Sequence, residues 1–304
     1  MSEIVSPIAL WKAIFCSYCI GVFAGCSGTE EQTSIDAPEI ISSSQLIKDT
    51  GGRTTYIASN TYYTGTVIDY YGDGKSIRYR ATYEDGLRTG EEAEFRKDGQ
   101  PTRKCQFSGG KRDGLELFWH QNGHPKSATN YFNNLASGAC HSWNTNGIKV
   151  RTSTYTNGML LSHCAFHPNG KRKRVARYLK GKLHGVSQQW YPNGEIEWRA
   201  AYVNGLQNGM AIGWLSDGQK SYESDWHLGT SHGLSKKWYA NGNLKSMTTY
   251  LSGKKNGEAM GAYEDGQLEW QAYWHEDQIH GVYREWHPNG RRKLERIYLN
   301  GEKY

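Results

Sequence analysis

The sequence is poor in the aliphatic and sulfur-containing side chains that fill large hydrophobic cores. Only 37% of its 304 residues are hydrophobic, with 7 phenylalanines and 5 methionines, whereas globular chains usually reach about 45–50%. In their place stand 36 glycines, 21 tyrosines and 11 tryptophans. A disordered chain lacks so many rings, and Tyr and Trp keep a polar tip in water while the ring packs. This composition predicts a β structure with extensive wetted surfaces.

The apolar run nearest the N-terminus, residues 13 to 25, has 13 residues and is too short to span a bilayer. Its length suits the core of a signal peptide, and Lys12 precedes it. The stretch "FAGC", residues 23 to 26, resembles the lipobox of bacterial lipoproteins, in which the cysteine is diacylated and becomes the new N-terminus. We therefore predict a signal peptide at residues 1 to 25 and lipidation of Cys26.

Two features depart from the lipobox pattern. Phe23 stands where leucine is usual, and Glu3 reduces the positive charge before the apolar run. An ordinary secretory signal, or a buried segment with a chance cysteine, is the alternative. If the lipobox is used, the protein is an exported lipoprotein anchored in a bacterial membrane, the outer membrane if the organism has two.

The segment after the predicted cleavage site lacks any period. Residues 27 to about 55 are rich in Ser, Thr and Glu, a composition typical of a linker. We predict that residues 26 to 55 form a flexible tether that holds the folded part away from a membrane.

Cysteines are too few for a disulfide framework. Cys16 and Cys19 lie inside the apolar run and are removed with it, so we assign them no redox or zinc role. If Cys26 carries lipid, Cys105, Cys140 and Cys164 remain, which allows at most one intramolecular disulfide. The sequence leaves the pairing open.

Charge is also modest, with a formal net value of +6. Such a value favours acidic surfaces or polymers only weakly. Nucleic acid binding depends on a much denser positive charge, and an exported protein rarely meets nucleic acid. We therefore expect no nucleic acid partner.

What the sequence has instead is a repeat of about 24 residues. Ten Asn-Gly or Asp-Gly dipeptides fall in one frame, with spacings between 23 and 25 residues, and a repeat at one period determines the fold before any other signal. The turn glycines are Gly74, Gly99, Gly123, Gly147, Gly170, Gly194, Gly218, Gly242, Gly266 and Gly290. Another glycine stands nine residues before each of them, except at Leu161.

Aromatic residues follow the same frame in two columns. Four residues before the turn glycine stand Tyr70, Phe95, Trp119, Trp143, Phe166, Trp190, Trp214, Trp238 and Trp286. Eight residues after it stand Phe107, Tyr131, Tyr155, Tyr178, Tyr202, Trp226, Tyr250, Trp274 and Tyr298. Between the turns, apolar and polar residues alternate, as in half-buried antiparallel strands.

Each unit therefore predicts one β-hairpin. Asn-Gly and Asp-Gly suit a two-residue type I′ turn, because both central residues need a positive φ. The ring-x-x-Gly-x-x-x-Gly segment, such as residues 178 to 185, makes the longer turn into the next hairpin. The fold class is all-β, an elongated single-layer antiparallel meander of about ten hairpin repeats over residues 56 to 304. About 20 strands at ~4.8 Å spacing give a sheet ~90–100 Å long.

This pattern resembles the MORN repeat (membrane occupation and recognition nexus). Copies such as "GKLHGVSQQWYPNGEI", residues 181 to 196, and "GTSHGLSKKWYANGNL", residues 229 to 244, are similar to the bacterial MORN variant known from YwqK-type antitoxin proteins. The resemblance covers residues 62 to 304. It implies a β-hairpin array used for binding or scaffolding and no catalytic activity. Predicted export departs from an antitoxin role, so we do not transfer that role.

Most polar candidates for a site fit structural roles better. His184, His232 and His280 lie two hairpins apart, roughly 19 Å by strand spacing, which is too far to share a metal whose ligands lie ~2 Å away. Glu195 and Glu197 are replaced by other residues in later copies. We expect no metal, no cofactor and no catalytic residue.

One unit departs from the frame. Residues 159 to 170 lack the first glycine, are one residue short, and contain His163, Cys164 and His167. A Cys–His catalytic pair is one interpretation, and an irregular bulge is the interpretation we favour. The basic runs at residues 171 to 174 and 291 to 293 suit a solvated face or a guard against edge aggregation, with anionic lipid or wall polymer as the alternative.

The aromatic columns are the best candidates for recognition. Most of the rings pack across strands, but a single-layer sheet leaves part of its apolar face uncovered, and exposed aromatic stripes mark binding surfaces. The predicted binding residues are Trp119, Trp143, Trp190, Trp214, Trp238, Trp286, Tyr202 and Tyr250. We predict a protein-interaction or scaffold module of the cell envelope, with a binder of wall glycan or anionic lipid as the alternative.

Overall fold

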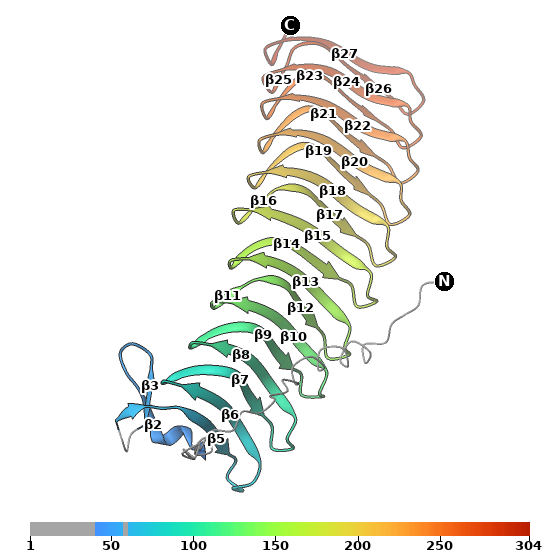
Figure 1. Cartoon of the computed structure of the whole chain (residues 1–304). Coiled ribbons are helices and arrows are strands. Elements are labelled where there is room, and N and C mark those ends of the chain that lie inside the picture. Colours follow the sequence, from blue (N-terminus) through green and yellow to red (C-terminus); the bar gives the residue numbers. More distant parts are fainter. Residues whose placement is uncertain (1–39, 57–59) are drawn as a thin grey trace, which may run out of the picture. The chain divides into compact units, whose positions relative to one another are not determined.

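The computed structural model describes residues 40–56 and 60–304. Within these ranges the only helix is the three-residue 3-10 helix η2 (Ser43–Gln45), and all other regular elements are strands. Figure 1 shows hairpins placed side by side in sequence order, from β5 to β27. The described residues contain no helix long and apolar enough to cross a membrane. The predicted signal peptide, Cys26 and the first part of the predicted tether lie outside the described residues.

The first half of the main sheet contains β1 (Ile40–Ile41), β5 (Gly65–Tyr70), β6 (Ile77–Glu84), β7 (Leu87–Phe95), β8 (Pro101–Ser108), β9 (Lys111–Trp119), β10 (Pro125–Phe132), β11 (Leu135–Ala136), β12 (Gly138–Trp143), β13 (Lys149–Thr156) and β14 (Met159–Phe166). The second half contains β15 (Arg172–Leu179), β16 (Lys182–Leu183), β17 (Gly185–Trp190), β18 (Ile196–Val203), β19 (Leu206–Trp214), β20 (Lys220–His227), β21 (Thr230–Trp238), β22 (Leu244–Leu251), β23 (Lys254–Ala262), β24 (Leu268–His275), β25 (Gln278–Ile279), β26 (Gly281–Trp286), β27 (Arg292–Leu299) and β28 (Glu302–Lys303).

Twenty-five strands form this single sheet. From β5 onward the strands pair antiparallel with their neighbours along the chain. β10, β15 and β24 each pair with two following strands, a short one (β11, β16 or β25) and the one after it (β12, β17 or β26). Among the described strands of this sheet, β1 alone pairs in parallel, with β5. The sheet formed by the described strands is open. The predicted meander of hairpin repeats is therefore confirmed.

The two kinds of turn are the reverse of what the sequence predicted. At the turn glycine Gly194, the N–H of Gly194 donates to Tyr191 O, and the N–H of Tyr191 donates to Glu195 O. Gly194 has a positive φ but Asn193 does not, which is the three-residue loop of a type I turn followed by a left-handed glycine. The type I′ prediction for this turn was wrong, because only one of its residues adopts the left-handed conformation.

The two-residue turns lie at the other end of the hairpins. Val203 pairs with Leu206 across Asn204 and Gly205, whose φ angles are 52° and 89°, as a type I′ turn requires. The same pair of positive φ angles recurs at Asp85–Gly86, Gly109–Gly110, Asn133–Asn134, Asn157–Gly158, Lys180–Gly181, Leu228–Gly229, Ser252–Gly253, Glu276–Asp277 and Asn300–Gly301.

The sheet presents two different faces. On one face, a row of side chains runs across the middle of the strands, one residue from each long strand from β5 to β24; we call it the central row, and we call the face that carries it the alanine face. The central row consists of Val67, Ala81, Glu92, Cys105, Glu116, Thr129, Cys140, Ser153, His163, Ala176, Ser187, Ala200, Ala211, Ser224, Ser235, Thr248, Ala259 and Ala272. Most are small, and Ala176 and Ala200 are only 0% and 2% exposed. Rings two residues away on the same strand, such as Trp198 and Tyr202 beside Ala200, flank the row and leave room only for small side chains.

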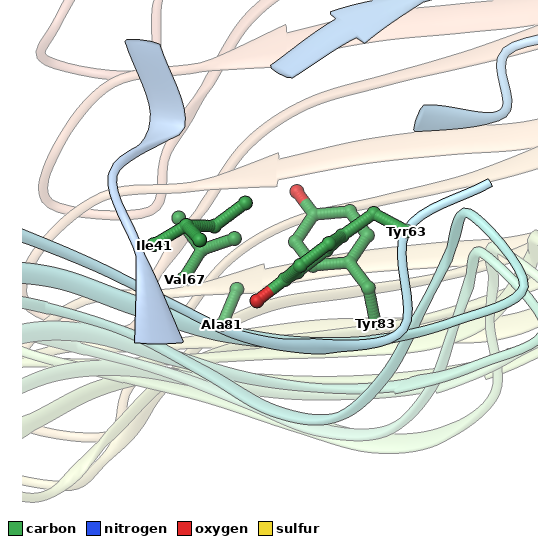
Figure 2. Packing of buried hydrophobic residues seen from close by; sticks show 5 residues of the cluster. All are labelled: Ile41, Tyr63, Val67, Ala81 and Tyr83. Carbon is green, nitrogen blue, oxygen red and sulfur yellow. The ribbon is translucent and has the colours of Figure 1, made fainter. Parts of the chain in front are cut away.

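The chain covers the first strands of the alanine face with its own N-terminal segment. Ile41 and Tyr63 pack on Val67, Ala81 and Tyr83 and form the one buried cluster of the described residues; Figure 2 shows the five side chains together on one side of the sheet. This is the arrangement expected of a cap, because a terminal repeat has no neighbour to bury its surface.

Part of the predicted tether therefore belongs to the folded unit. Besides β1 and η2, the cap contains β2 (Leu46–Lys48), β3 (Thr54–Tyr56) and β4 (Thr61–Tyr62), which form a separate three-stranded sheet. The cap is fixed to the first repeat by hydrogen bonds from Gly86 N to Tyr63 O and from Thr54 N to Gly86 O. These residues carry no 24-residue period, so the repeat pattern gave no sign of them.

Consecutive repeats are also joined at the turns. The hydroxyl of Tyr191 donates to the carbonyl of Trp214, one repeat later, at 2.9 Å. Equivalent bonds join Tyr71 to Phe95, His120 to Trp143, His167 to Trp190, Tyr239 to Ala262 and Tyr263 to Trp286. A third column of the repeat, three residues before the turn glycine, thus consists mostly of Tyr and His because it reaches the next turn.

Leu215 occupies this column but has no polar group. We expect Tyr191→Phe to lower the free energy of unfolding by about 1 kcal/mol, the usual value of one hydrogen bond, and Leu215→Tyr to raise it by a similar amount. Urea unfolding followed by circular dichroism measures both. Tyr273→Phe is the control, since Tyr273 is 46% exposed. Equal effects of Tyr191→Phe and Tyr273→Phe would rule out a stabilising role for this column.

Candidate functional site

The irregular unit forms a shortened bulge and no catalytic pair. In the regular strand β19, three residues around Gly209 lie opposite the single residue Ala201, whereas in β14 only Leu161 is left unpaired. Gly209 has a positive φ and Leu161 does not. Loss of one residue from the bulge thus removes the left-handed position and, with it, the need for glycine.

His163 and Cys164 are neighbours on β14, so their side chains point to opposite faces of the sheet. His163 Nδ1 lies 3.3 Å from Ser153 Oγ, and His167 Nε2 lies 2.7 Å from Trp190 O. Burial raises the pKa of Cys164, which disfavours a thiolate nucleophile. Among the described residues no group of His, Cys, Asp and Glu is placed to hold a metal ion.

The three cysteines of the array are all free. Cys105 and Cys140 lie in the central row with two strands between them, about 14 Å apart by strand spacing, and Cys164 lies on the opposite face. A disulfide requires Cα atoms within about 7 Å, so none of the three pairs forms. Burial, followed by the charge of Glu116, raises the pKa of Cys105 to about 11.

The predicted aromatic site residues are divided between the two faces. By strand alternation, the tryptophans at positions such as Trp190, Trp214 and Trp238 lie on the face opposite the alanine face, next to the turns, whereas Tyr202 and Tyr250 flank the central row. All are half-buried. The predicted binding residues therefore belong to two separate surfaces in the structure.

Two further rings on the alanine face lie over glycines. A Cβ atom at Gly213 would overlap the ring of Tyr222, and one at Gly261 would overlap the ring of Trp270. Both glycines lie in strands and have no positive φ, so the ring, and not the backbone, requires glycine there, as in ring-covered glycines of designed sheets.

We expect Gly213→Ala to destabilise the array by about 1–3 kcal/mol, as overpacking usually does, because the ring of Tyr222 must leave its place. The double variant Gly213→Ala/Tyr222→Ala is the control, since without the ring the added methyl group has room. Thermal unfolding of the two single variants and the double variant gives the coupling. Strict additivity would show that the ring does not require the glycine.

An ionic cluster is the main feature that the sequence did not reveal. Glu92 and Glu116, 3% and 5% exposed, occupy two positions of the central row. Arg103 lies between them and binds both: its Nη1 is 2.6 Å from Glu92 Oε1, and its Nη2 is 2.8 Å from Glu116 Oε1. Arg88 also binds Glu92, and Tyr79 donates to it at 2.9 Å. The arginines and Tyr79 thus compensate the two buried carboxylates, because a buried charge without a partner is strongly destabilising.

Electrostatics of the cluster favour its charged form. Burial alone raises the pKa of Glu92, but Arg88, Arg103 and the hydroxyl of Tyr79 outweigh it, and the pKa lies below the ordinary value for glutamate. The pKa of Tyr79 is raised by burial and by the charge of Glu92. A signal for this cluster exists in the sequence, since Glu92 and Glu116 replace small residues in the central row, but that row is recognisable only after the register is known.

A second missed feature is the distribution of charge. Between Glu116 and Glu195 the sequence has no Asp or Glu but ten Lys and Arg. The rest of the chain has 26 Lys and Arg against 30 Asp and Glu, so the net +6 combines +10 in the middle hairpins with −4 elsewhere. A whole-chain total conceals this difference.

The two basic runs consequently differ. In the run at residues 291 to 293, Arg292 binds Glu295 at 2.6 Å and Lys293 binds Glu285 at 3.1 Å. In the run at residues 171 to 174 no side chain of the described structure forms an ion pair, and Lys171 Nζ donates to the carbonyl of Asn193. Of the two runs, only residues 171 to 174 form a positive surface without acidic partners.

The histidines before the first glycine of the hairpins lie at strand irregularities and not in the turns: His232 belongs to β21, and His184 and His280 stand just before β17 and β26. His280 Nδ1 lies 3.1 Å from Asn300 Oδ1, His232 stacks near His227 with ring centroids 5.9 Å apart, and Nδ1 of His184 is buried without a partner. Glu197 accepts a hydrogen bond from Gln189 at 2.7 Å.

Comparison with known proteins agrees with this repeat. A family model described as MORN repeat variant matches residues 112–133, 183–204 and 231–251. Each match begins just after one two-residue turn and ends near the next, so it covers one hairpin of the sheet. Among curated proteins, none matches the sequence.

Similarities to solved structures are weak. One is a Photorhabdus luminescens Tc holotoxin pore, at 12% identity and a TM-score of 0.20, which covers 84% of this chain and 16% of the other. Two others are a TcdB2-TccC3-Cdc42 complex (TM-score 0.16) and a TcdB2-TccC3 structure (TM-score 0.17), each at 12% identity and covering 85% of this chain and 16% of the other. The chain thus spans about one sixth of these structures, and scores this low establish no common fold.

Proposed function

We propose that this chain, which belongs to the MORN-repeat proteins, is a non-enzymatic binding scaffold of the cell envelope that holds a protein partner on its alanine face. Arrays of this kind are binding or scaffold modules and are typically without catalytic activity. The proposal includes the predicted export of the chain and a lipid anchor at Cys26.

The observation that supports a binding role is the uncovered part of the alanine face. The cap covers the central row only at the first strands, at Val67 and Ala81. Beyond them the row of small residues and its flanking rings continue across the sheet to β24 without a covering layer in the described structure. Aromatic rings that border an open apolar surface are typical of binding sites.

The cap also indicates what kind of partner fits. Ile41 lies on an extended strand and Tyr63 on an extended loop, and both place their side chains over small residues of the row. An extended segment of another protein finds the rings that flank the row further along the face, at Trp198 and Tyr202 for example. The alanine face therefore suits an extended polypeptide with apolar side chains.

Two sets of ring variants test the proposal. In the first, Tyr202→Ala, Trp226→Ala and Tyr250→Ala remove rings from the alanine face. In the second, Trp190→Ala, Trp214→Ala and Trp238→Ala remove three rings from the opposite face. Each is compared with the unchanged protein by crosslinking and pull-down from native envelopes, after circular dichroism has confirmed the fold.

We expect a specific protein to be recovered with the unchanged chain and with the opposite-face variant, and lost with the alanine-face variant. Loss only with the opposite-face variant would place the binding surface on the tryptophan column. Recovery of wall glycan or lipid without any protein would replace the proposal by an envelope-binding function.

The anchor has its own test. We expect the protein extracted from membranes to begin at Cys26 and to carry a diacyl modification that mass spectrometry detects, and we expect Cys26→Ser to abolish the modification and release the protein from the membrane fraction. An unmodified N-terminus on a membrane-associated protein would refute the lipoprotein assignment.

A further inference from the structure

Two arginines on the alanine face have no acidic partner. Arg151 on β13 and Arg174 on β15 both pair with Ala165 of β14, which lies between them. Their Cα atoms are therefore about 10 Å apart by strand spacing, and their side chains are on the same face as the central row. In the part of the chain that the structure describes, neither forms an ion pair, although the structure has fifteen such bridges elsewhere.

Neighbouring residues hold the side chain of Arg174 in place but do not supply all its hydrogen-bond partners. Its guanidinium lies 5.4 Å from the ring centroid of Trp198, and its buried Nε has no hydrogen-bond partner. The carboxylate of Glu197, on the next hairpin, accepts from Gln189 instead. A stacked arginine without an acidic partner suits an anionic acceptor, because guanidinium groups bind carboxylates in a fixed, bidentate geometry.

Small and polar residues lie between the two arginines. His163 and Ala165 belong to the intervening strand, and Arg151 lines a cavity of about 300 Å³ together with Ser142, Ser153 and Tyr155. Burial and the charges of Arg151 and Arg174 lower the pKa of His163. Both arginines are therefore close enough to this side chain to affect it electrostatically. Ala165, which pairs with both arginines, has only a small side chain on this face.

We propose that Arg151 and Arg174 bind a carboxylate of an extended acidic peptide segment that lies along the alanine face. This inference rests on the proposed function and specifies the partner. The acid-free middle hairpins attract the segment over a longer range, and the two arginines then fix its position.

The neighbouring strands favour a peptide over a uniformly charged polymer. On one side the alanine face carries Glu92 and Glu116, where Arg88, Arg103 and Arg112 are already bound to carboxylates of the chain itself. On the other side it carries Trp198 and Tyr202 beside Ala200, which suit apolar side chains. Arg151 and Arg174, the unpaired arginines of β13 and β15, match a short acidic stretch next to apolar residues.

A labelled peptide tests the inference. The probe is a fluorescein-labelled octapeptide of alternating glutamate and leucine, and its counterpart has glutamine in place of glutamate. Binding to the full chain is followed by fluorescence anisotropy at low and physiological salt. Arg151→Gln/Arg174→Gln is compared with Lys173→Gln/Arg177→Gln, which removes the same charge from exposed residues of the same acid-free segment; Arg177 lies on the opposite face.

We expect the acidic peptide to bind, the glutamine peptide to bind much more weakly, and Arg151→Gln/Arg174→Gln to weaken binding at least about tenfold, as loss of a paired charge does. The control pair should change affinity by less than about threefold, through screening-sensitive attraction alone. The variant Arg151→Lys/Arg174→Lys should restore only part of the affinity, because lysine cannot bind in the bidentate geometry.

Equal weakening by both glutamine pairs would overturn the inference, because net charge would then explain the binding without a site. Absence of peptide binding together with binding of phosphatidylglycerol vesicles would overturn it in favour of a lipid headgroup. In the envelope pull-down, a partner that is lost with the alanine-face ring variant but kept by Arg151→Gln/Arg174→Gln would leave the proposed function intact and refute the arginine site alone.

Discussion

Replacing Arg103 with methionine is expected to lower the free energy of unfolding by about 3–5 kcal/mol, the usual cost of leaving a buried charge without its partner. Arg103 is the one residue that binds both Glu92 and Glu116, and the two carboxylates are 3% and 5% exposed. Without the guanidinium, two negative charges remain in the central row with only Arg88 and Arg112 beside them. Urea unfolding combined with hydrogen exchange of β7–β9 measures the effect.

The pH dependence of this part of the array has a definite sign. Because the pKa of Glu92 is lower in the folded protein than in the unfolded chain, its stabilising contribution is complete above the unfolded value of about 4.3. The contribution is lost as the pH falls through the lower native pKa. We expect the Glu92→Gln variant to lose this part of the acid sensitivity. A variant with unchanged stability and an unchanged acid limb would show that the cluster is energetically neutral.

Introducing glutamate at Ala200 is expected to have a comparable effect with the opposite pH dependence. Ala200 is 2% exposed and lies in the same central row as Glu92, but Trp198 and Tyr202 flank it on its own strand and no arginine is paired with it. An ionised carboxylate buried without a partner costs several kcal/mol or takes up a proton. We therefore expect Ala200→Glu to lower the free energy of unfolding by at least about 3 kcal/mol at neutral pH.

The sign reverses because burial raises the native pKa of the new carboxyl above its unfolded value. The neutral form is favoured in the folded state, so the Ala200→Glu variant should regain stability as the pH falls through that raised pKa. Ala200→Gln separates charge from size, since it has nearly the same volume and no titration. A pH profile of Ala200→Glu that parallels that of the unchanged protein would contradict this account of the central row.

The two experiments together test what makes the alanine face tolerant of charge. The same residue type is placed in the same row, with arginines beside it at Glu92 and rings beside it at Ala200. If both predictions hold, local partners and not the row itself decide where a polar partner can bind. The unpaired Arg151 and Arg174 are then the place on the face where an added carboxylate finds compensation.

The sequence by itself determined the unit of this protein. Asn-Gly and Asp-Gly at a period of 24, with glycines and rings in fixed columns, specify hairpins because each column meets a local requirement: glycine for a positive φ, alternation for a half-covered strand. The fold class, the repeat and the meander followed from these local requirements, whereas only the structure shows that the sheet stays open. The sequence also indicated that residues 159 to 170 form an irregular bulge and not a catalytic pair, because this unit is one residue shorter than the others.

Only the tertiary structure decided which residues meet across strands. The two-residue and three-residue turns lie at the opposite ends of the hairpins from those predicted. The reason is that Asn-Gly fits both a type I′ turn, as at Gly205, and the last two positions of a three-residue loop, as at Gly194. The cap lacks the period and could not be found from it. The central row, the ionic cluster of Glu92 and Arg103, and the unpaired Arg151 and Arg174 depend on the register of strands about eleven to thirteen residues apart. A shift of one residue would move each of these side chains to the other face, which is why the sequence supplied the repeat and the register supplied the site.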